Sequence, residues 1–241
     1  MLLPSLKTPP KADLADLTVL LYSKQKYGKS TWCAQADQAL FLATEAGLNH
    51  LETFQIPIRS WDEMLQACAE IAAGKHPFKT IIIDTVDNAY RMCTDYVCAK
   101  LSIAHESEAG YGRGYAMVNN EFARVLTKLS LLPYGLYLTS HAQEREIETR
   151  AGTVTRVMPT LPDKARKIVL GMVDMILYID LEATQHDKGD TTYRRVVRTK
   201  PTVHYEAGDR TGRLPDTLDL DYPTFIQAFT KATDRAERSA T

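Results

Sequence analysis

The chain has little cysteine, almost no net charge and no long apolar run. Its four cysteines among 241 residues show no C-x-x-C spacing, which argues against a zinc site and favours reduced thiols. No apolar stretch approaches the roughly 18 residues of a membrane-spanning helix, and no signal-peptide core follows the N-terminus. We therefore expect a cytoplasmic protein without a membrane partner. With 29 basic and 30 acidic residues, the net charge of −1 does not by itself indicate a nucleic-acid-binding protein.

Strand-like and helix-like patterns alternate along a length that allows one large domain or two small ones. This alternation predicts an α/β fold with a mostly parallel, twisted sheet flanked by helices. The polar stretch 144–162 predicts irregular structure, and residues 187–190 predict a hairpin turn. Strands are expected at residues 17–22, 40–44, 80–84, 135–140, 175–181 and 193–199, and helices at 30–38, 60–73, 88–102, 117–131, 165–171 and 222–232.

The segment after the first expected strand carries a phosphate-binding motif. Gly28-Lys29-Ser30-Thr31 matches the end of the P-loop pattern G-x-x-x-x-G-K-[ST], although Ser23 stands where the pattern has glycine. A helix N-terminus attracts phosphate through its free N–H groups and partial positive charge. Lys29 would reach the outer phosphates and Ser30 would hold Mg²⁺. The predicted nucleotide-binding residues are Ser23, Lys24, Gln25, Lys26, Tyr27, Gly28, Lys29, Ser30 and Thr31.

A second short apolar run, residues 79–84, ends in Asp84. A β-branched run of this kind is typical of a strand buried on both faces of a parallel sheet. An aspartate at the end of such a strand can lie beside the P-loop serine and its Mg²⁺, although many buried strands end in aspartate merely as a helix cap. The order of the two motifs favours a metal site made by Ser30 and Asp84.

Three further segments follow in an order that resembles a known family. They are Thr44-Glu45-Ala46-Gly47, Tyr137-Leu138-Thr139-Ser140-His141 and Val196-Val197-Arg198-Thr199-Lys200. With the P-loop and Asp84, they make residues 17–229 similar to the RecA-like P-loop ATPases, in particular small phage-encoded nucleotide-binding proteins, some of which are single-strand annealing recombinases. The resemblance implies a RecA-like core with a C-terminal antiparallel hairpin, and ATP and Mg²⁺ as cofactors.

The resemblance also implies catalytic roles. Lys29 and Asp84 would act at the phosphates, Glu45 would activate the attacking water, and His141 would sense the terminal phosphate where the family usually has an amide. On an expected strand, alternation puts Arg198 and Lys200 on one face, from which they would reach the ATP of a neighbouring subunit. A solvated basic edge strand is the simpler interpretation of that pair. Arg210 is a rival for the same role.

An ATPase of this family would form a homo-oligomer, as a ring or a filament. Its partners would be single-stranded DNA and a single-strand DNA-binding protein, in the host bacterial cytoplasm for a phage-encoded chain. The expected organisation is a flexible lead over residues 1–16, one RecA-like ATPase domain over 17–232 and a polar tail over 233–241.

Two segments fall where the family binds DNA. Residues 107–115 combine glycines with aromatic and basic side chains, which suit stacking on bases and contact with phosphate. Residues 143–167 form a second long segment with several arginines. The candidate DNA-binding residues are Tyr111, Arg113, Tyr115, Arg145, Arg150 and Arg156.

Two other functions remain open at this stage. A P-loop kinase or phosphotransferase would need an acceptor pocket and an arginine-rich lid, for which the segment from Arg145 to Arg166 is a candidate. A nucleotide-binding scaffold without turnover is kept open by Ser23, because the loop could depart from working P-loop geometry.

Overall fold

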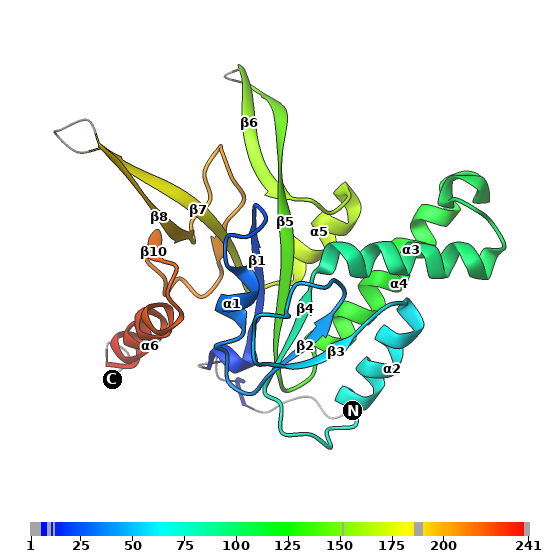
Figure 1. Ribbon diagram of the computed structural model, residues 1–241, viewed down its shortest axis with the longest axis horizontal. Coiled ribbons are helices and arrows are strands. Elements are labelled where there is room, and N and C mark those ends of the chain that lie inside the picture. The colour runs from blue at the N-terminus through cyan, green and yellow to red at the C-terminus, as the bar shows by residue number, and fades with distance from the viewer. Residues whose placement is uncertain (1–5, 9–10, 12, 151, 186–189, 239–241) are drawn as a thin grey trace.

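The computed structural model describes residues 6–8, 11, 13–150, 152–185 and 190–238, and its centre is a mixed sheet with helices on both faces (Figure 1). The described strands follow the order β10-β8-β7-β1-β5-β4-β2-β3, and β6 and β9 pair with β5 and β7 away from this path. The strands are β1 (Thr18–Ser23), β2 (Ala39–Ala43), β3 (Phe54–Pro57), β4 (Thr80–Asp84), β5 (Gly135–Thr149), β6 (Gly152–Pro159), β7 (Met175–Gln185), β8 (Thr191–Arg198), β9 (Gly208–Asp209) and β10 (Thr217–Asp219).

The middle of the sheet is parallel and its C-terminal side is antiparallel. β1 pairs in parallel with β5 and β7, β4 with β5 and β2, and β2 with β3. β8 is antiparallel to both β7 and β10. The predicted α/β fold with a mostly parallel sheet and a C-terminal antiparallel hairpin is therefore confirmed. Because parallel strands share one direction, the segments after β1, β2 and β4 meet at one edge of the sheet.

Two apolar cores lie on opposite faces of the sheet. The helices are α1 (Lys29–Cys33), α2 (Trp61–Ala72), α3 (Val86–Leu101), α4 (Arg113–Ser130), α5 (Asp163–Met172) and α6 (Tyr222–Arg238), with the 3₁₀ turns η1 (Leu14–Asp16) and η2 (Glu106–Ala109). Helices α2 to α5 pack on the face that includes Leu20, and α1 and α6 pack on the face that includes Leu21. Adjacent residues of β1 thus serve different cores, which explains why this strand is apolar throughout.

The stretch expected to be irregular is instead a β-ribbon. β5 continues to Thr149 and pairs antiparallel with β6, from Ala142↔Pro159 to Thr149↔Gly152. We call residues 142–159 the arm, and Figure 1 shows it projecting from the sheet. The sequence prediction was wrong because most of the arm's side chains are exposed or half-buried, so no apolar pattern marks the two strands.

Other element boundaries also differ from the sequence prediction. Helix α4 begins at Arg113, within the segment expected to be a loop, and α6 continues to Arg238. The edge strand β3 was not predicted, because its four residues are mostly exposed. Of the expected hairpin turn at 187–190, residues 186–189 lie outside the described residues. The division into lead, domain and tail stays a prediction. No helix in the described part of the chain has the length and apolar character to cross a membrane.

Candidate functional site

The P-loop joins β1 to α1, and its left-handed backbone conformations occur at two positions other than Ser23. Ser23 ends β1 and pairs with His141 of β5, so its backbone is extended and does not need glycine. The left-handed positions are Lys26, with a φ of 63°, and Gly28, with a φ of 98°. A Cβ on Gly28 would lie 3.0 Å from Nη1 of Arg195, so both conformation and space favour glycine there.

Lys29 is a buried cation with only neutral oxygens around it. Its Nζ donates to the Ser23 carbonyl at 3.4 Å, the Ser23 hydroxyl at 3.2 Å and the Lys24 carbonyl at 3.3 Å. Within the described residues, no carboxylate lies within ion-pairing distance of this ammonium. Burial lowers the pKa of Lys29, opposed by the charges of Asp84 and Glu45. A buried ammonium without an anionic partner, beside the P-loop backbone, fits a bound polyphosphate.

Ser30 and Asp84, for which the sequence predicts a metal site, are in direct contact in the structure. The Ser30 hydroxyl donates to Oδ2 of Asp84 at 2.6 Å, although 54 positions separate them. Asp84 is 2% exposed, and the Thr139 hydroxyl on β5 donates to its other oxygen. A hydroxyl and a carboxylate in direct contact are the oxygen ligands that Mg²⁺ takes in phosphoryl-transfer sites, so the residues fit that ion.

Glu45 and His141 form a contact on one side of the same site. Nε2 of His141 lies 3.5 Å from Oε2 of Glu45, and Nδ2 of Asn88 donates to that oxygen at 3.1 Å. The hydrogen bond with His141 is the main reason why the pKa of Glu45 is lowered, and Lys29 adds to it. Glu45 is therefore ionised at neutral pH, as a residue that accepts a proton from water must be.

Asp87, at the start of α3, holds the strand segment that carries His141. Its carboxylate accepts hydrogen bonds from the Ser140 hydroxyl at 2.8 Å and from the His141 backbone N–H at 3.0 Å. Burial raises the pKa of Asp87, although these two hydrogen bonds act to lower it. Nδ1 of His141 is buried and has no partner in the described part of the chain. The backbone of His141 is thus fixed while one ring nitrogen keeps an unused hydrogen-bonding position.

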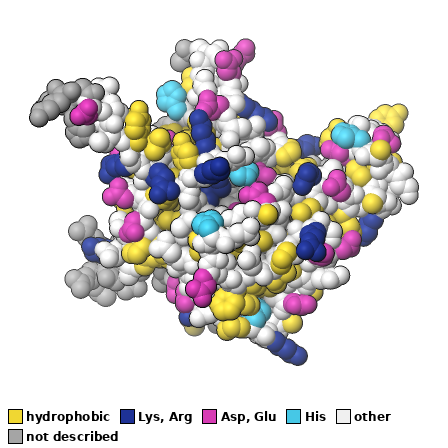
Figure 2. Space-filling model, viewed as in Figure 1, with side chains coloured by type: hydrophobic (Ala, Val, Ile, Leu, Met, Phe, Trp, Pro, Cys, Tyr) yellow, Lys and Arg dark blue, Asp and Glu magenta, His cyan; other side chains and the backbone are white. Residues whose placement is uncertain are grey.

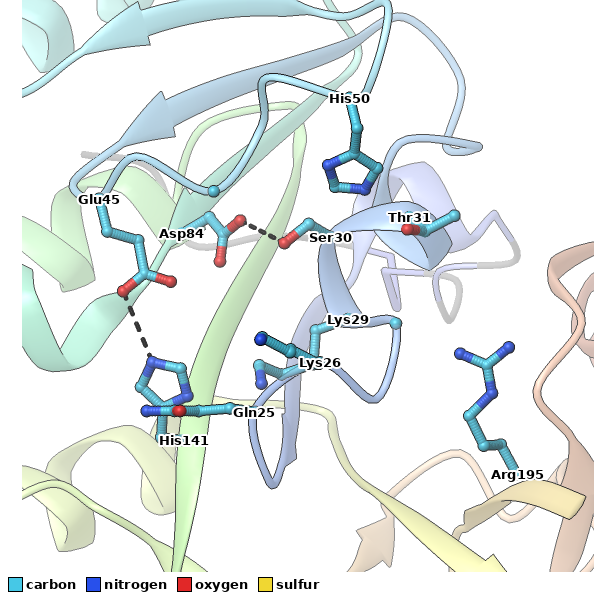
Figure 3. Close-up of a pocket in the computed structure, with 12 residues that line it drawn as sticks. Gln25, Lys26, Lys29, Ser30, Thr31, Glu45, His50, Asp84, His141 and Arg195 are labelled. Carbon is cyan, nitrogen blue, oxygen red and sulfur yellow. Dashed lines mark hydrogen bonds and ion pairs between the residues drawn. The ribbon is translucent and has the colours of Figure 1, made fainter. Parts of the chain in front are cut away.

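These groups surround one open pocket of about 460 Å³. Figure 3 shows Glu45, Asp84 and His141 on one side of the P-loop and Arg195 on the other. Figure 2 shows basic side chains gathered on this face of the molecule, which suits a polyanionic ligand. The lining residues are Gln25, Lys26, Gly28, Lys29, Ser30, Thr31, Glu45, Gly47, His50, Asp84, His141 and Arg195.

Arg198 and Lys200 do not line this pocket. Arg198 lies 3.2 Å from Asp180 and 3.0 Å from Glu182, and its side chain is 19% exposed. β8 ends at Arg198, so Lys200 lies beyond the strand, where it is 3.8 Å from Asp209. The expectation that the two share a strand face was wrong, because β8 ends at Arg198, one residue earlier than predicted, and Lys200 lies outside the strand. Their action on a neighbouring subunit stays a prediction, as does that of Arg210, whose Nη1 lies 3.7 Å from Asp174.

Three pocket residues had no predicted role: Gly47, which belongs to the segment quoted with Glu45, and His50 and Arg195, which were missed altogether. His50 follows β2 in an irregular segment, where no periodicity indicates which way a side chain points. Arg195 lies on β8 with Arg194 and Arg198, and a basic strand does not show which arginine faces the P-loop. The one usable signal was period-two alternation, which places Arg195 on the same face as the apolar Val197.

The DNA-binding candidates fall into two separate groups. Tyr111 is fully exposed before α4, and Arg113 and Tyr115 are exposed in its first turn. Figure 1 shows this α3–α4 connection and the tip of the arm at different corners of the molecule.

The arginine candidates belong to the arm. Arg145 and Arg156 face each other across its two strands, and Arg150 follows β5 at the tip. Arg145 lies 2.7 Å from Asp163 and Arg156 lies 3.3 Å from Glu206. Two of the three arm arginines are therefore already paired within the chain.

Known proteins resemble this chain at low identity. The SPbeta prophage-derived uncharacterized protein YorG of Bacillus subtilis (strain 168) is 23% identical over 176 residues, which cover 70% of this chain and 52% of that protein. The chain thus spans about half the length of this curated relative.

Solved structures also match. The KaiC-like protein PH0186 of Pyrococcus horikoshii OT3 matches with a TM-score of 0.43 and 14% identity, over 76% of this chain and 78% of that one. The flagellar accessory protein FlaH of Methanocaldococcus jannaschii matches with a TM-score of 0.43 and 12% identity, over 84% of each chain.

A family model covers most of the chain. The model described as AAA domain matches residues 15–211, which include the P-loop, Glu45, Asp84, His141 and the β7–β8 hairpin. The phosphate-binding geometry and this match agree, and the chain belongs to the AAA domain family of P-loop ATPases.

Proposed function

We propose that this protein binds and hydrolyses ATP with Mg²⁺ in the pocket at the P-loop. The observation that carries the proposal is the Ser30–Asp84 hydrogen bond beside the unpaired ammonium of Lys29, with the ionised Glu45 across the pocket. Phosphoryl transfer depends mainly on positioning and on neutralising charge, and these residues supply both.

Each residue has a role that its contacts support. Lys29 binds the outer phosphates, and Ser30 and Asp84 hold the ion. Bound Mg²⁺ supplies charge neutralisation at the phosphates. Glu45 orients the attacking water and accepts its proton, because His141 and Lys29 keep its carboxyl ionised. His141 positions Glu45 through the 3.5 Å contact.

The structure weighs against the two other functions. The candidate for a kinase lid, the segment from Arg145 to Arg166, instead forms most of the arm and the start of α5, and Arg145, Arg156 and Arg166 pair with acids. The scaffold interpretation rested on Ser23, whose extended backbone needs no glycine. Hydrolysis is therefore favoured over both.

We further propose that the protein acts as an oligomer on single-stranded DNA, in recombination or strand annealing. Tyr111 offers a wholly exposed ring, and Arg113 is exposed two residues later, a combination that suits base stacking with phosphate contact. The arm adds Arg150 at its tip. The prophage origin of the relative YorG is consistent with this role. A single-strand DNA-binding protein is the proposed partner.

The test is steady-state ATP turnover at low salt, with and without single-stranded DNA, because phosphate contacts weaken as salt rises. Wild-type protein should hydrolyse ATP faster with DNA, and Lys29→Ala should abolish ATP binding. Turnover that ignores DNA would support a phosphotransferase. Binding without turnover would support the scaffold.

The DNA site is tested by the double variant Tyr111→Ala, Arg113→Ala. It should keep DNA-free turnover and lose most DNA binding. Phe54→Ala is the matched control, because Phe54 is 60% exposed on the edge strand β3. Equal DNA binding by the double variant and the control would remove this segment from the DNA site.

The subunit-bridging role is tested by mixing variants. Arg198→Ala and Glu45→Ala proteins should each be inactive and should partly restore turnover when mixed. Such rescue requires a cation from one subunit to serve a site in the next. A mixture as inactive as its components would exclude Arg198 from that role.

A further inference from the structure

Three arginines lie close together on β8, and only Arg195 lines the pocket. Arg194 lies 2.6 Å from Glu182 and 2.8 Å from Asp219, and Arg198 pairs with Asp180 and Glu182. Successive side chains of a strand point to opposite faces. Val197 packs in the core with α1 and α6, so Arg195, two residues earlier, lies on the α1 side. The phase of β8 therefore directs Arg195 toward the P-loop.

The guanidinium of Arg195 lies against the P-loop backbone. Its Nη1 donates to the Tyr27 carbonyl at 3.3 Å and would be 3.0 Å from a Cβ placed on Gly28. Among the described residues, no carboxylate is within ion-pairing distance of Arg195, in contrast to its paired neighbours. A guanidinium has five donors, and this single bond uses one of them. The remaining donors are available at the edge of the pocket.

The position of Arg195 in the pocket indicates which part of a nucleotide it would contact. Figure 3 shows Arg195 across the P-loop from Glu45 and His141, on the side of Thr31. Glu45 and His141 mark the end of the pocket where the transferred phosphoryl group would lie. Arg195 is therefore at the opposite end, where the phosphates closer to the nucleoside would lie.

We propose that Arg195 binds, within its own chain, the inner phosphates that ATP and ADP share. This inference rests on the proposed function of the pocket. An arginine fork makes charge-assisted hydrogen bonds that match phosphate oxygens. The β7–β8 hairpin then contributes directly to nucleotide affinity, in either nucleotide state. This role is distinct from that of a cation reaching in from a neighbouring subunit.

The test compares Arg195→Ala and Arg195→Gln with Arg194→Ala, the same residue type one position away. Affinities for ADP and for a non-hydrolysable ATP analogue are measured by calorimetry with Mg²⁺. Both Arg195 variants should bind each nucleotide about tenfold more weakly, the loss expected for one charge-assisted hydrogen bond. Arg194→Ala should bind both as wild type does. Circular dichroism confirms that the variants are folded, and Gln keeps a long polar side chain.

Two results would overturn the proposal. One is wild-type affinity for both nucleotides in both Arg195 variants, and the other is a loss confined to the ATP analogue, which would place Arg195 at the terminal phosphate. Lys29→Ala separates this inference from the proposed function. If that variant loses binding while the Arg195 variants keep it, only the inference fails. If wild-type protein binds neither nucleotide, the function and the inference fail together.

Discussion

Replacing Lys29 by methionine should stabilise the protein without nucleotide and destabilise it relative to wild type with nucleotide. Lys29 is 6% exposed, and its three acceptors lie 3.2 to 3.4 Å away. Charge-assisted N–H···O bonds are normally about 2.7–2.9 Å long, so these contacts only partly offset the cost of removing the ammonium from water. Methionine has a similar length and shape and carries no charge.

The size of the effect follows from these contacts. The desolvation penalty of a buried ion is several kcal/mol after relaxation, and weak bonds repay part of it, which leaves a net cost of about 1–2 kcal/mol. The Ser23 hydroxyl is not left without a partner in the variant, because it donates to the Lys24 carbonyl at 2.7 Å. At about 2–4 °C per kcal/mol for a chain of this size, the melting temperature should rise by several degrees.

Saturating nucleotide should reverse the order of stability. Wild-type protein gains about 2.7 kcal/mol at a ligand concentration one hundred times Kd, and Lys29→Met should gain almost nothing. Denaturant unfolding with and without ADP and Mg²⁺ measures both effects. Lys26→Met is the control for stability without nucleotide, because Lys26 is an exposed lysine of the same loop.

The pH dependence gives an independent check. Burial lowers the pKa of Lys29 from its ordinary value of 10.5, so the unfolded chain binds this proton more tightly than the folded one. The loss of stability caused by burying the charged Lys29 is therefore present in full below the pKa of Lys29 in the folded protein, and it declines as the pH rises toward 10.5. Wild type should approach Lys29→Met in stability at alkaline pH. A variant that is less stable than wild type by 1 kcal/mol or more without nucleotide, at neutral pH, would refute the reasoning.

Three further predictions concern other parts of the molecule. Glu45→Gln should bind ATP and lose turnover by about 100-fold or more. Because His141 is the main reason why the pKa of Glu45 is lowered, His141→Gln should let that pKa rise toward its ordinary value, so the loss of turnover on acidification should begin at a higher pH than in wild type. A pH profile of turnover that does not shift would contradict this. Thr139→Val removes a hydrogen-bond donor to the buried Asp84. The free energy of unfolding, measured with denaturant, should fall by about 1–2 kcal/mol, and Mg²⁺ should bind more weakly. A variant with wild-type Mg²⁺ affinity would contradict this prediction. Phe225 is fully buried, and its ring centroid lies 5.1 Å from that of Trp32. Phe225→Ala leaves a cavity there and should lower the free energy of unfolding by about 3–5 kcal/mol, whereas a loss under 1 kcal/mol would contradict this.

Much of the site follows from local sequence because it is built from segments that follow strands. Gly28, Lys29 and Ser30 are adjacent in a motif, and Asp84 ends a buried apolar run. Once the sheet is known to be parallel, the ends of these strands must meet at one edge, which brings Ser30 and Asp84 together. Their catalytic roles stay predictions, although the structure places them around one pocket with Glu45 and His141.

The arm shows where such reasoning fails. Its strands pair with each other from Ala142↔Pro159 outward and bury few side chains, so their sequence carries no hydrophobic alternation. What stabilises them is backbone hydrogen bonding to a partner strand, which a one-dimensional pattern does not record.

Local motifs and chain order were enough to predict the parallel α/β sheet, the P-loop and the acid that contacts its serine, because each depends on a short run of residues. That Ser23 needs no glycine is visible only in the fold, because it depends on where β1 ends. The fold alone also shows which arginine of β8 lines the P-loop pocket. Arg194, Arg195 and Arg198 have the same charge and size. They differ in which face of β8 carries the side chain, the α1 side or the opposite one, and in which carboxylates lie nearby.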